Sequence, residues 1–447
     1  MTLIDLTTPS LRSSRLDGLP VAIIGAGPIG LAAAANLVER GIDFVVYEAG
    51  EDAGASIQKW AHIRFFSPWR HLVDPASRRL LEATGWTAPR EETLPTGGEF
   101  VSAYLEPLSN VEAIASRIRY GITVDAVSRE GMDRTRSAGR ADTPFLLRVS
   151  GIDSATDAST DSAADGVQEV TARAVIDASG TYLTPNSLAS SGLDPLGLPA
   201  VADRISHALP DVVGRERDRF AGKRVAVVGA GHSAANTLLN LAALKREVPE
   251  TQITWLIRNA SAVRVTSSPD DELAARAAIG RRVDRLIEAG IVEQIDRFEI
   301  IRVAPAGDGL RLIGDRVGDV IERETDVVVN ATGFRPNLDI LREIRLELDA
   351  IVEAPSRLAP LIDPNIHTCG TVEPHGFAEL RQPEPNFFLA GMKSYGRAPT
   401  FLLATGYEQV RSITAFLAGD IASATNVQLV LPATGVCSTG AVGSSCC

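Results

Sequence analysis

Two glycine-rich segments have the residue types and spacing of a loop that binds the phosphates of a dinucleotide. The first, residues 25–30, reads Gly-Ala-Gly-Pro-Ile-Gly and follows four apolar residues, 21–24, which predict a short buried parallel strand. Each glycine has an expected structural role. Gly25 makes the tight turn, Gly27 lets a pyrophosphate approach the backbone, and Gly30 lets the following helix pack against the strand.

The elements that must position this loop occur in the required order. Residues 31–40 predict a helix that Gly41 ends, and the N-terminus of such a helix offers free N–H groups and partial positive charge to phosphates. A second predicted strand, residues 44–47, ends at Glu48, whose carboxylate can accept hydrogen bonds from ribose hydroxyls. A lone glycine pattern is weak, but this complete order favours dinucleotide binding over a glycine-rich helix start.

The second glycine-rich segment, residues 229–234, reads Gly-Ala-Gly-His-Ser-Ala and follows a predicted strand at 224–228. Ala234 takes the third glycine position, as the fingerprint permits. The next predicted strand, residues 253–257, ends at Arg258 instead of an acid. A cation there suits a 2′-phosphate, so the pattern favours NADPH over NADH; the alternative is that Arg258 only covers the sheet edge.

Two similar strands bracket this second unit. Residues 174–180 and 326–333 each read as a buried strand that ends in small residues. We therefore expect an α/β fold with two Rossmann-like domains, the second inserted in the first. The chain would leave the first domain near Gly180 and return near Gly333.

Bulk properties exclude several function classes. The chain has 447 residues, 45% hydrophobic and 22% charged, as in an ordinary globular protein. Its net charge of −12 argues against nucleic acid as a partner. No apolar run has the length of a membrane span and no secretory signal opens the chain, so we expect a cytoplasmic protein without a membrane partner.

The two fingerprints, together with Ala331-Thr332-Gly333, resemble the two-dinucleotide-binding flavoproteins over about residues 20 to 420. Within them, the chain most resembles the single-component, NADPH-dependent flavin-containing monooxygenases. The resemblance implies FAD on the first unit and NADPH on the second. It also implies that NADPH reduces the flavin, and that O2 then gives a C4a-peroxyflavin, which transfers one oxygen atom to a small-molecule substrate.

The resemblance also implies domains and site residues. The expected domains are an N-terminal leader (1–18), an FAD-binding domain in two parts (19–195 and 326–425), an NADPH-binding domain (196–325) and a cysteine-bearing tail (426–447). The positions that match cofactor contacts are Gly25, Gly27, Pro28, Ile29, Gly30 and Glu48 for FAD, Gly229, Gly231, His232, Ser233, Ala234 and Arg258 for NADPH, and Thr332, Gly333, Gly391 and Met392. We expect the backbone of Gly391 and Met392 near the flavin.

The sequence departs from the subgroup in one signature. Of F-x-G-x-x-x-H-x-x-x-F/W only His207 remains, with Val201, Asp203 and Asp211 at the other positions. His207 is therefore a catalytic candidate, but neither Baeyer–Villiger oxidation nor standard sulfoxidation is implied. No C-x-x-C occurs, which excludes a thioredoxin reductase that needs a dithiol beside its flavin.

Three of the four cysteines, Cys437, Cys446 and Cys447, fall in the last eleven residues, and the fourth is Cys369. Thiolates are soft donors, and three on one segment can close around As(III) or Sb(III). The late cysteine pair also resembles that of flavin monooxygenases associated with arsenic resistance. These three cysteines are thus candidate metalloid ligands and catalytic groups. Incidental thiols, a redox relay and a lipidation signal stay open as alternatives.

Our main functional hypothesis is an FAD-dependent, NADPH-consuming monooxygenase that oxygenates trivalent arsenic or antimony. The alternatives are a reductase or oxidase that uses the C-terminal thiols, an N- or S-oxygenating enzyme for an organic substrate, and a non-catalytic metalloid-binding flavoprotein. The aromatic and basic segment at 65–71 is either a packed loop or a loop of the site. The expected partners are a small-molecule substrate and O2, and a homodimer is left open.

Overall fold

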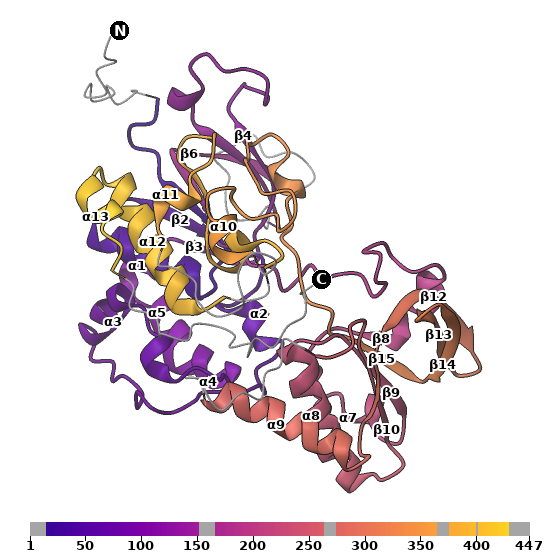
Figure 1. Cartoon of the computed structure of the whole chain (residues 1–447). Coiled ribbons are helices and arrows are strands. Elements are labelled where there is room, and N and C mark those ends of the chain that lie inside the picture. Colours follow the sequence, from indigo (N-terminus) through magenta and orange to yellow (C-terminus); the bar gives the residue numbers. More distant parts are fainter. Residues whose placement is uncertain (1–14, 152–165, 263–273, 364–374, 399–400, 429–447) are drawn as a thin grey trace.

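The computed structural model of the chain describes residues 15–151, 166–262, 274–363, 375–398 and 401–428. It has two lobes, each built around a five-stranded parallel β-sheet (Figure 1). No helix among these residues has the length and apolar character needed to cross a membrane.

The sheet of the first lobe collects strands from both ends of the chain. Its strand order is β16-β7-β1-β2-β3, and every pairing is parallel. Its strands are β1 (Val21–Ile24), β2 (Phe44–Tyr47), β3 (Ile118–Arg119), β7 (Ala174–Asp177) and β16 (Phe387–Leu389). The residues of β1, β7 and β16 are all buried, because this parallel sheet is covered on both faces.

Two helices cover one face of this sheet. Helix α1 (Pro28–Glu39) is almost entirely apolar, and the later helix α12 (Leu403–Leu417) packs along it. Pro28 begins α1, where a missing N–H costs nothing. The shorter helices of the lobe are α2 (Ala55–Gln58), α3 (Pro75–Glu82), α4 (Gly97–Phe100), α5 (Glu106–Ser109), α6 (Glu112–Ala115), α10 (Ala359–Ile362), α11 (Phe377–Leu380) and α13 (Ile421–Thr425).

The sheet of the second lobe has the order β11-β10-β9-β15-β8 and is also parallel. Its strands are β8 (Ile205–Ser206), β9 (Arg224–Val228), β10 (Gln252–Leu256), β11 (Glu293–Ile295) and β15 (Val327–Asn330). Helices α8 (His232–Glu247) and α9 (Ala274–Glu288) pack against each other in this lobe, which also contains α7 (Arg217–Phe220).

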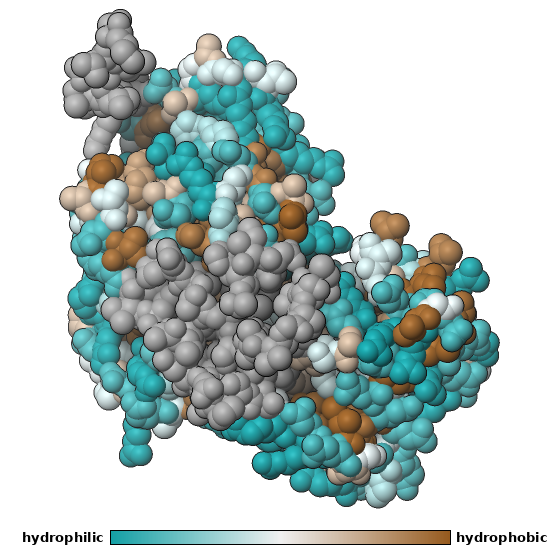
Figure 2. Space-filling view, in the orientation of Figure 1, coloured by the Kyte–Doolittle hydropathy of each residue, from teal (hydrophilic) through white to brown (hydrophobic). Residues whose placement is uncertain are grey.

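A three-stranded antiparallel sheet accompanies each parallel sheet. One comprises β4 (Thr123–Arg129), β5 (Phe145–Ser150) and β6 (Val167–Ala172), and its apolar residues share a core with β1 and β7. The other comprises β12 (Phe298–Ala306), β13 (Gly309–Arg316) and β14 (Asp319–Thr325) and shares a core with β9 and β15. Ile301 and Val320 in this outer sheet, and Val317 in the turn between β13 and β14, are exposed apolar side chains. Figure 2 shows apolar surface on the lobe at its right.

The chain crosses between the lobes in two adjacent segments. Pro185 pairs antiparallel with Phe334, and the Asn186 N–H donates to the Gly333 carbonyl at 2.9 Å. All strands of the second sheet lie between β7 and β16 in sequence, so the second Rossmann-like unit is inserted in the first, as predicted. The expected domain limit at 325/326 falls just before β15, which pairs with β9 and so belongs to the second sheet.

Candidate functional site

The first glycine turn leaves open space for a phosphate beside Gly27. We call this space, and the equivalent one beside Gly231 in the second turn, a nucleotide seat. Gly25 has a φ of +99°, and a Cβ there would lie 3.0 Å from the Ala178 carbonyl oxygen. A Cβ on Gly30 would lie 1.9 Å from the Gly25 carbonyl oxygen, so only glycine lets α1 begin this close to the strand. A Cβ on Gly27 would meet no atom of the described residues within 4 Å. Gly27 thus leaves a free approach to the backbone at the N-terminus of α1.

Glu48 is fixed beside this turn. It directly follows β2, its Oε2 accepts the Ala26 N–H at 2.6 Å, and its Oε1 accepts the Gly50 N–H at 2.8 Å. Each carboxylate oxygen has a second lone pair, which a ribose hydroxyl can use. The open cradle, the helix N-terminus and this carboxylate together fit an adenine dinucleotide.

A late turn, the 3-10 helix Gly391–Tyr395, completes this side of the site. A Cβ on Gly391 would lie 2.9 Å from Ile29 Cγ1, so the turn rests on the first residues of α1. The Gly391 N–H donates to Gln409 Oε1 at 2.8 Å. It therefore points to α12, which corrects the expectation that this N–H faces the flavin. Met392 is half-buried.

Sequence reasoning missed a buried ion pair at the same edge. The side chains of Lys393 and Asp177 are both 0% exposed, and Lys393 Nζ lies 2.6 Å from Asp177 Oδ2. Two signals of this pair are present in the sequence: a lysine inside the apolar segment 387–395, and an aspartate at the end of a buried strand. Neither alone identifies its partner.

The second glycine turn has the same construction. Gly229 has a φ of +127°, and a Cβ there would lie 2.1 Å from the Ala331 carbonyl oxygen. In the described parts of the chain, a Cβ on Gly231 would meet no atom within 4 Å, and Ala234 is completely buried against the sheet. His232 and Ser233 begin α8, so they lie where a helix N-terminus can bind a phosphate.

Arg258 lies just beyond β10, as predicted, and is exposed. No hydrogen bond or ion pair joins it to another residue in the described parts of the chain. Its guanidinium is therefore available to a 2′-phosphate.

Thr332 and Gly333, which the resemblance assigns to cofactor binding, lie at the crossing between the lobes beside the second glycine turn. The Thr332 hydroxyl donates to Asn330 Oδ1 at 2.7 Å, and a Cβ on Gly333 would lie 3.2 Å from Asn186 Nδ2. Both residues thus maintain the crossing between the lobes, next to the Ala331 carbonyl that confines the second turn.

The aromatic loop of the first lobe reaches the second glycine turn. The Phe66 ring lies 5.4 Å from the His232 ring, measured between centroids. Trp69, in the same loop, is buried and packs on Phe100. The loop is therefore packed on the first lobe through Trp69 and contacts the second glycine turn through Phe66.

His207 lies at the lobe crossing and not at either glycine turn. Its ring lies 4.6 Å from that of Tyr182 and stacks on Phe334 at 5.6 Å. It borders a cavity of about 370 Å³ that Lys59 and Arg219 also line. Burial raises the pKa of Tyr182 to about 12, so this phenol stays protonated at neutral pH.

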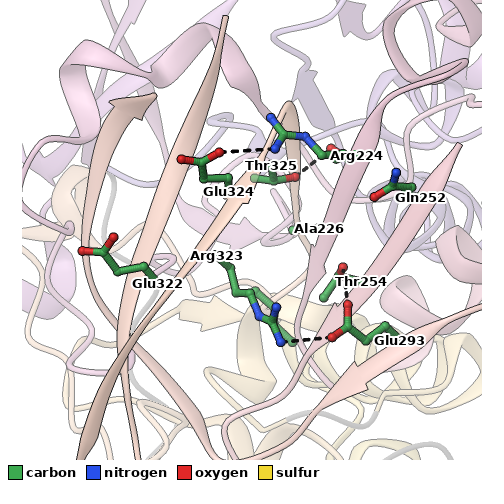
Figure 3. Close-up of a pocket in the computed structure, with 10 residues that line it drawn as sticks. Arg224, Ala226, Gln252, Thr254, Glu293, Glu322, Arg323, Glu324 and Thr325 are labelled. Carbon is green, nitrogen blue, oxygen red and sulfur yellow. Dashed lines mark hydrogen bonds and ion pairs between the residues drawn. The ribbon is translucent and has the colours of Figure 1, made fainter. Parts of the chain in front are cut away.

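A second cleft lies between β14 and the second parallel sheet (Figure 3). Two ion pairs cross it: Arg323 pairs with Glu293 at 3.0 Å, and Arg224 with Glu324 at 3.4 Å. None of the predicted site residues line this cleft, whose volume is about 190 Å³. Its ion pairs connect β14 to strands of the second parallel sheet.

The cysteine predictions lie outside the described residues, because Cys369, Cys437, Cys446 and Cys447 all fall in undescribed segments. Within the residues that are described, no group of three or more His, Cys, Asp or Glu side chains could hold a metal ion.

Comparisons with known proteins agree with this geometry. The family model of the pyridine nucleotide-disulphide oxidoreductases matches residues 22–133 and 149–364. The indole-3-pyruvate monooxygenase YUCCA1 of Oryza sativa subsp. japonica is 29% identical over 220 residues, which are 49% of this chain. The match spans 44% of the rice protein, so less than half of that relative is covered.

Solved structures share the fold. The bacillithiol disulfide reductase of Bacillus cereus has a TM-score of 0.64 at 18% identity, covering 90% of this chain and 99% of its own. A mutant flavin monooxygenase of Stenotrophomonas maltophilia has a TM-score of 0.54 at 25% identity, covering 89% and 99%. The ornithine N-hydroxylase of Kutzneria sp. 744 has a TM-score of 0.57 at 18% identity, covering 91% and 98%. With two glycine turns and a family match over most of its length, the chain belongs to the pyridine nucleotide-disulphide oxidoreductase family, as an oxidoreductase whose cofactors are FAD and NADPH.

Proposed function

We propose that the enzyme is a monooxygenase that transfers one oxygen atom of O2 to a small, soft nucleophile. Two open seats, at Gly27 and Gly231, carry the proposal, since a Cβ on either glycine would meet no described atom within 4 Å. The Phe66–His232 contact brings a loop of the first lobe to the second seat. The 29% identity to a monooxygenase over 49% of this chain, and the lack of a C-x-x-C in the sequence, favour oxygenation over dithiol chemistry.

The chain's residues would divide the work between the two seats. Gly27, Glu48 and the N-terminus of α1 would hold FAD, and Gly231, the N-terminus of α8 and Arg258 would hold NADPH. Bound FAD supplies hydride acceptance and reaction with O2. Phe66, which contacts His232 at the second seat, would exclude water from that seat. NADPH gives two electrons, one oxygen atom enters the substrate, and the other leaves as water.

The substrate that we propose is trivalent arsenic or antimony. Support comes from the sequence, in which Cys437, Cys446 and Cys447 lie within eleven residues and thiolates bind soft ions. In this reaction As(III) loses two electrons and gains one oxygen atom to become As(V). An organic nitrogen or sulfur nucleophile would satisfy the same electron balance.

A second candidate is an NADPH-dependent reductase that passes electrons to the C-terminal thiols. The adjacent pair Cys446 and Cys447 favours it, because two neighbouring thiols can cycle through a disulfide. This reaction consumes NADPH without consuming O2.

Oxygen and NADPH consumption, measured together, separate these functions. The FAD-loaded enzyme is assayed with arsenite, with antimonite and with amine and thioether substrates. A monooxygenase consumes O2 and NADPH one to one and forms the oxygenated product. NADPH oxidation that continues without O2 supports the reductase, and peroxide formation unaffected by every substrate contradicts oxygenation. The double variant Cys446→Ser, Cys447→Ser tests the thiols, since unchanged arsenite stimulation would exclude them.

A further inference from the structure

An ammonium group is buried inside the first lobe. Lys393 Nζ donates to Asp177 Oδ2 at 2.6 Å and to Ser179 Oγ at 3.0 Å, and the side chains of Lys393 and Asp177 are both 0% exposed. Ser179 Oγ in turn donates to Asp177 Oδ1 at 2.7 Å. The three side chains form a closed network, which reaches the surface at the exposed Ser179.

This network lies at the edge where the cofactor must bind. Asp177 is the last residue of β7, and ligands of open α/β sheets lie beyond the carboxyl ends of the strands. A Cβ on Gly25 would lie 3.2 Å from Ser179 Cα, so the first glycine turn lies directly against the network. Lys393 belongs to the late turn, whose Gly391 rests on Ile29 of α1.

Holding the late turn in place does not by itself require an ion pair. A neutral network already does so, because Gln409 Oε1 accepts the Gly391 N–H at 2.8 Å and Gln409 Nε2 donates to Ser394 Oγ at 3.0 Å. Burying two charges carries a large desolvation penalty, and a buried ion pair contributes little to stability compared with apolar residues of the same volume. The charges of Lys393 and Asp177 therefore do more than hold the late turn in place.

We propose that Lys393 and Asp177 are positioning residues for FAD, which join the late turn to β7 under the first glycine turn and set the electrostatic potential that the flavin experiences. The inference rests on FAD binding at the first turn. It holds equally for an oxygenase and for a reductase, so its failure would leave the proposed function untouched.

The test uses two single variants with opposite expected effects. Lys393→Met removes the positive charge of the pair, and Asp177→Asn removes its negative charge. The midpoint potential of the bound flavin should fall in the first variant and rise in the second, because added negative charge disfavours the electron-rich reduced flavin. Each variant should also bind FAD at least about tenfold more weakly, as read by the fluorescence of released FAD. Shifts of the same sign, or none, overturn the proposal.

A matched control lies at the other end of β16. Glu384 is also completely buried and pairs with Arg129 at 2.8 Å, three residues before β16 begins at its amino end. Glu384→Gln should lower thermal stability without moving the flavin potential; an equal potential shift in this variant overturns the proposal. Should a single variant fail to fold, the double variant Lys393→Met, Asp177→Asn decides, because it leaves no unpaired charge. Wild-type FAD affinity in that double variant overturns the proposal.

Discussion

Matched alanine substitutions at the two open glycines should separate the cofactors. Gly27→Ala should weaken FAD binding and leave the fold intact, whereas Gly231→Ala should weaken NADPH binding and leave FAD bound. Both glycines are N-caps with extended backbone, at φ −76° and −101°, which alanine can adopt. Both also have space, among the described residues, where the new methyl group would lie.

The expected magnitudes follow from this environment. Alanine at either position lowers the conformational entropy of the unfolded chain, which stabilises the folded protein by about 0.4–1 kcal/mol. Alanine is also a poorer N-cap than glycine, which destabilises the folded protein by a similar amount. The free energy of unfolding of the apoprotein should thus stay within about 1 kcal/mol of wild type. The methyl group, however, occupies the approach of a charged phosphate to backbone N–H groups. Each such hydrogen bond contributes about 1.5–3 kcal/mol, so the loss of one weakens binding about 10- to 100-fold.

Two measurements check the reasoning. Denaturant titration of the apoproteins gives the free energy of unfolding without the stabilisation that a bound cofactor adds. Fluorescence titration with FAD and the KM for NADPH then give the two binding effects. Gly30→Ala is the contrasting control, because its Cβ would lie 1.9 Å from the Gly25 carbonyl oxygen and it should destabilise the fold. A Gly27→Ala protein that binds FAD with wild-type affinity would refute the assignment of the seat.

Three further changes test other parts of the structure. Arg258→Ala should raise the KM for NADPH about 10- to 100-fold and leave the KM for NADH unchanged, because the exposed guanidinium meets only the 2′-phosphate; equal losses with both nucleotides would contradict this. Burial raises the pKa of Asp74 from 3.8 to about 6, so its stabilising contribution is complete below about pH 4 and is lost as the pH rises towards 6. Asp74→Asn keeps an N-cap acceptor for the Ser77 N–H, and denaturant titrations should show a free energy of unfolding that is flatter between pH 4 and 6 and up to about 3 kcal/mol higher at pH 7. A steeper pH profile would exclude Asp74 as the cause. Phe66→Ala removes the contact with His232 and should increase peroxide release per NADPH with FAD still bound; unchanged peroxide yield would show that the loop excludes no water.

Local features of the fold could be predicted from the sequence. The glycine turns, the strands before them and the positions of Glu48 and Arg258 all follow from patterns within about 30 residues. The insertion of one unit in the other could also be predicted, because two similar strands that end in small residues, 174–180 and 326–333, bracket the second unit in the sequence. In the structure each of these strands lies beside a glycine turn.

Contacts between distant residues could not be predicted in this way. Lys393 and Asp177 are 216 residues apart, and no local period relates a lysine in one turn to an aspartate at the end of another strand. A glycine turn near a cofactor suggests a free donor, which is why the sequence points to the Gly391 N–H as a flavin contact. A glutamine on α12 takes that donor instead. His207 is the one residue of the F-x-G-x-x-x-H-x-x-x-F/W signature that this sequence keeps. Its ring stacks on Phe334 at the crossing of the lobes, which the signature does not predict.

The arrangement of the first sheet has a consequence for synthesis on the ribosome. Helix α1 forms from residues 28–39, but its covering partner α12 and the edge strand β16 are made more than 340 residues later. The second lobe, whose strands run from 205 to 330, can finish folding in that interval. The nascent chain therefore carries a completed second lobe while α1 still lacks α12 and the first sheet still lacks β16, so the first lobe is the last part of the molecule to close.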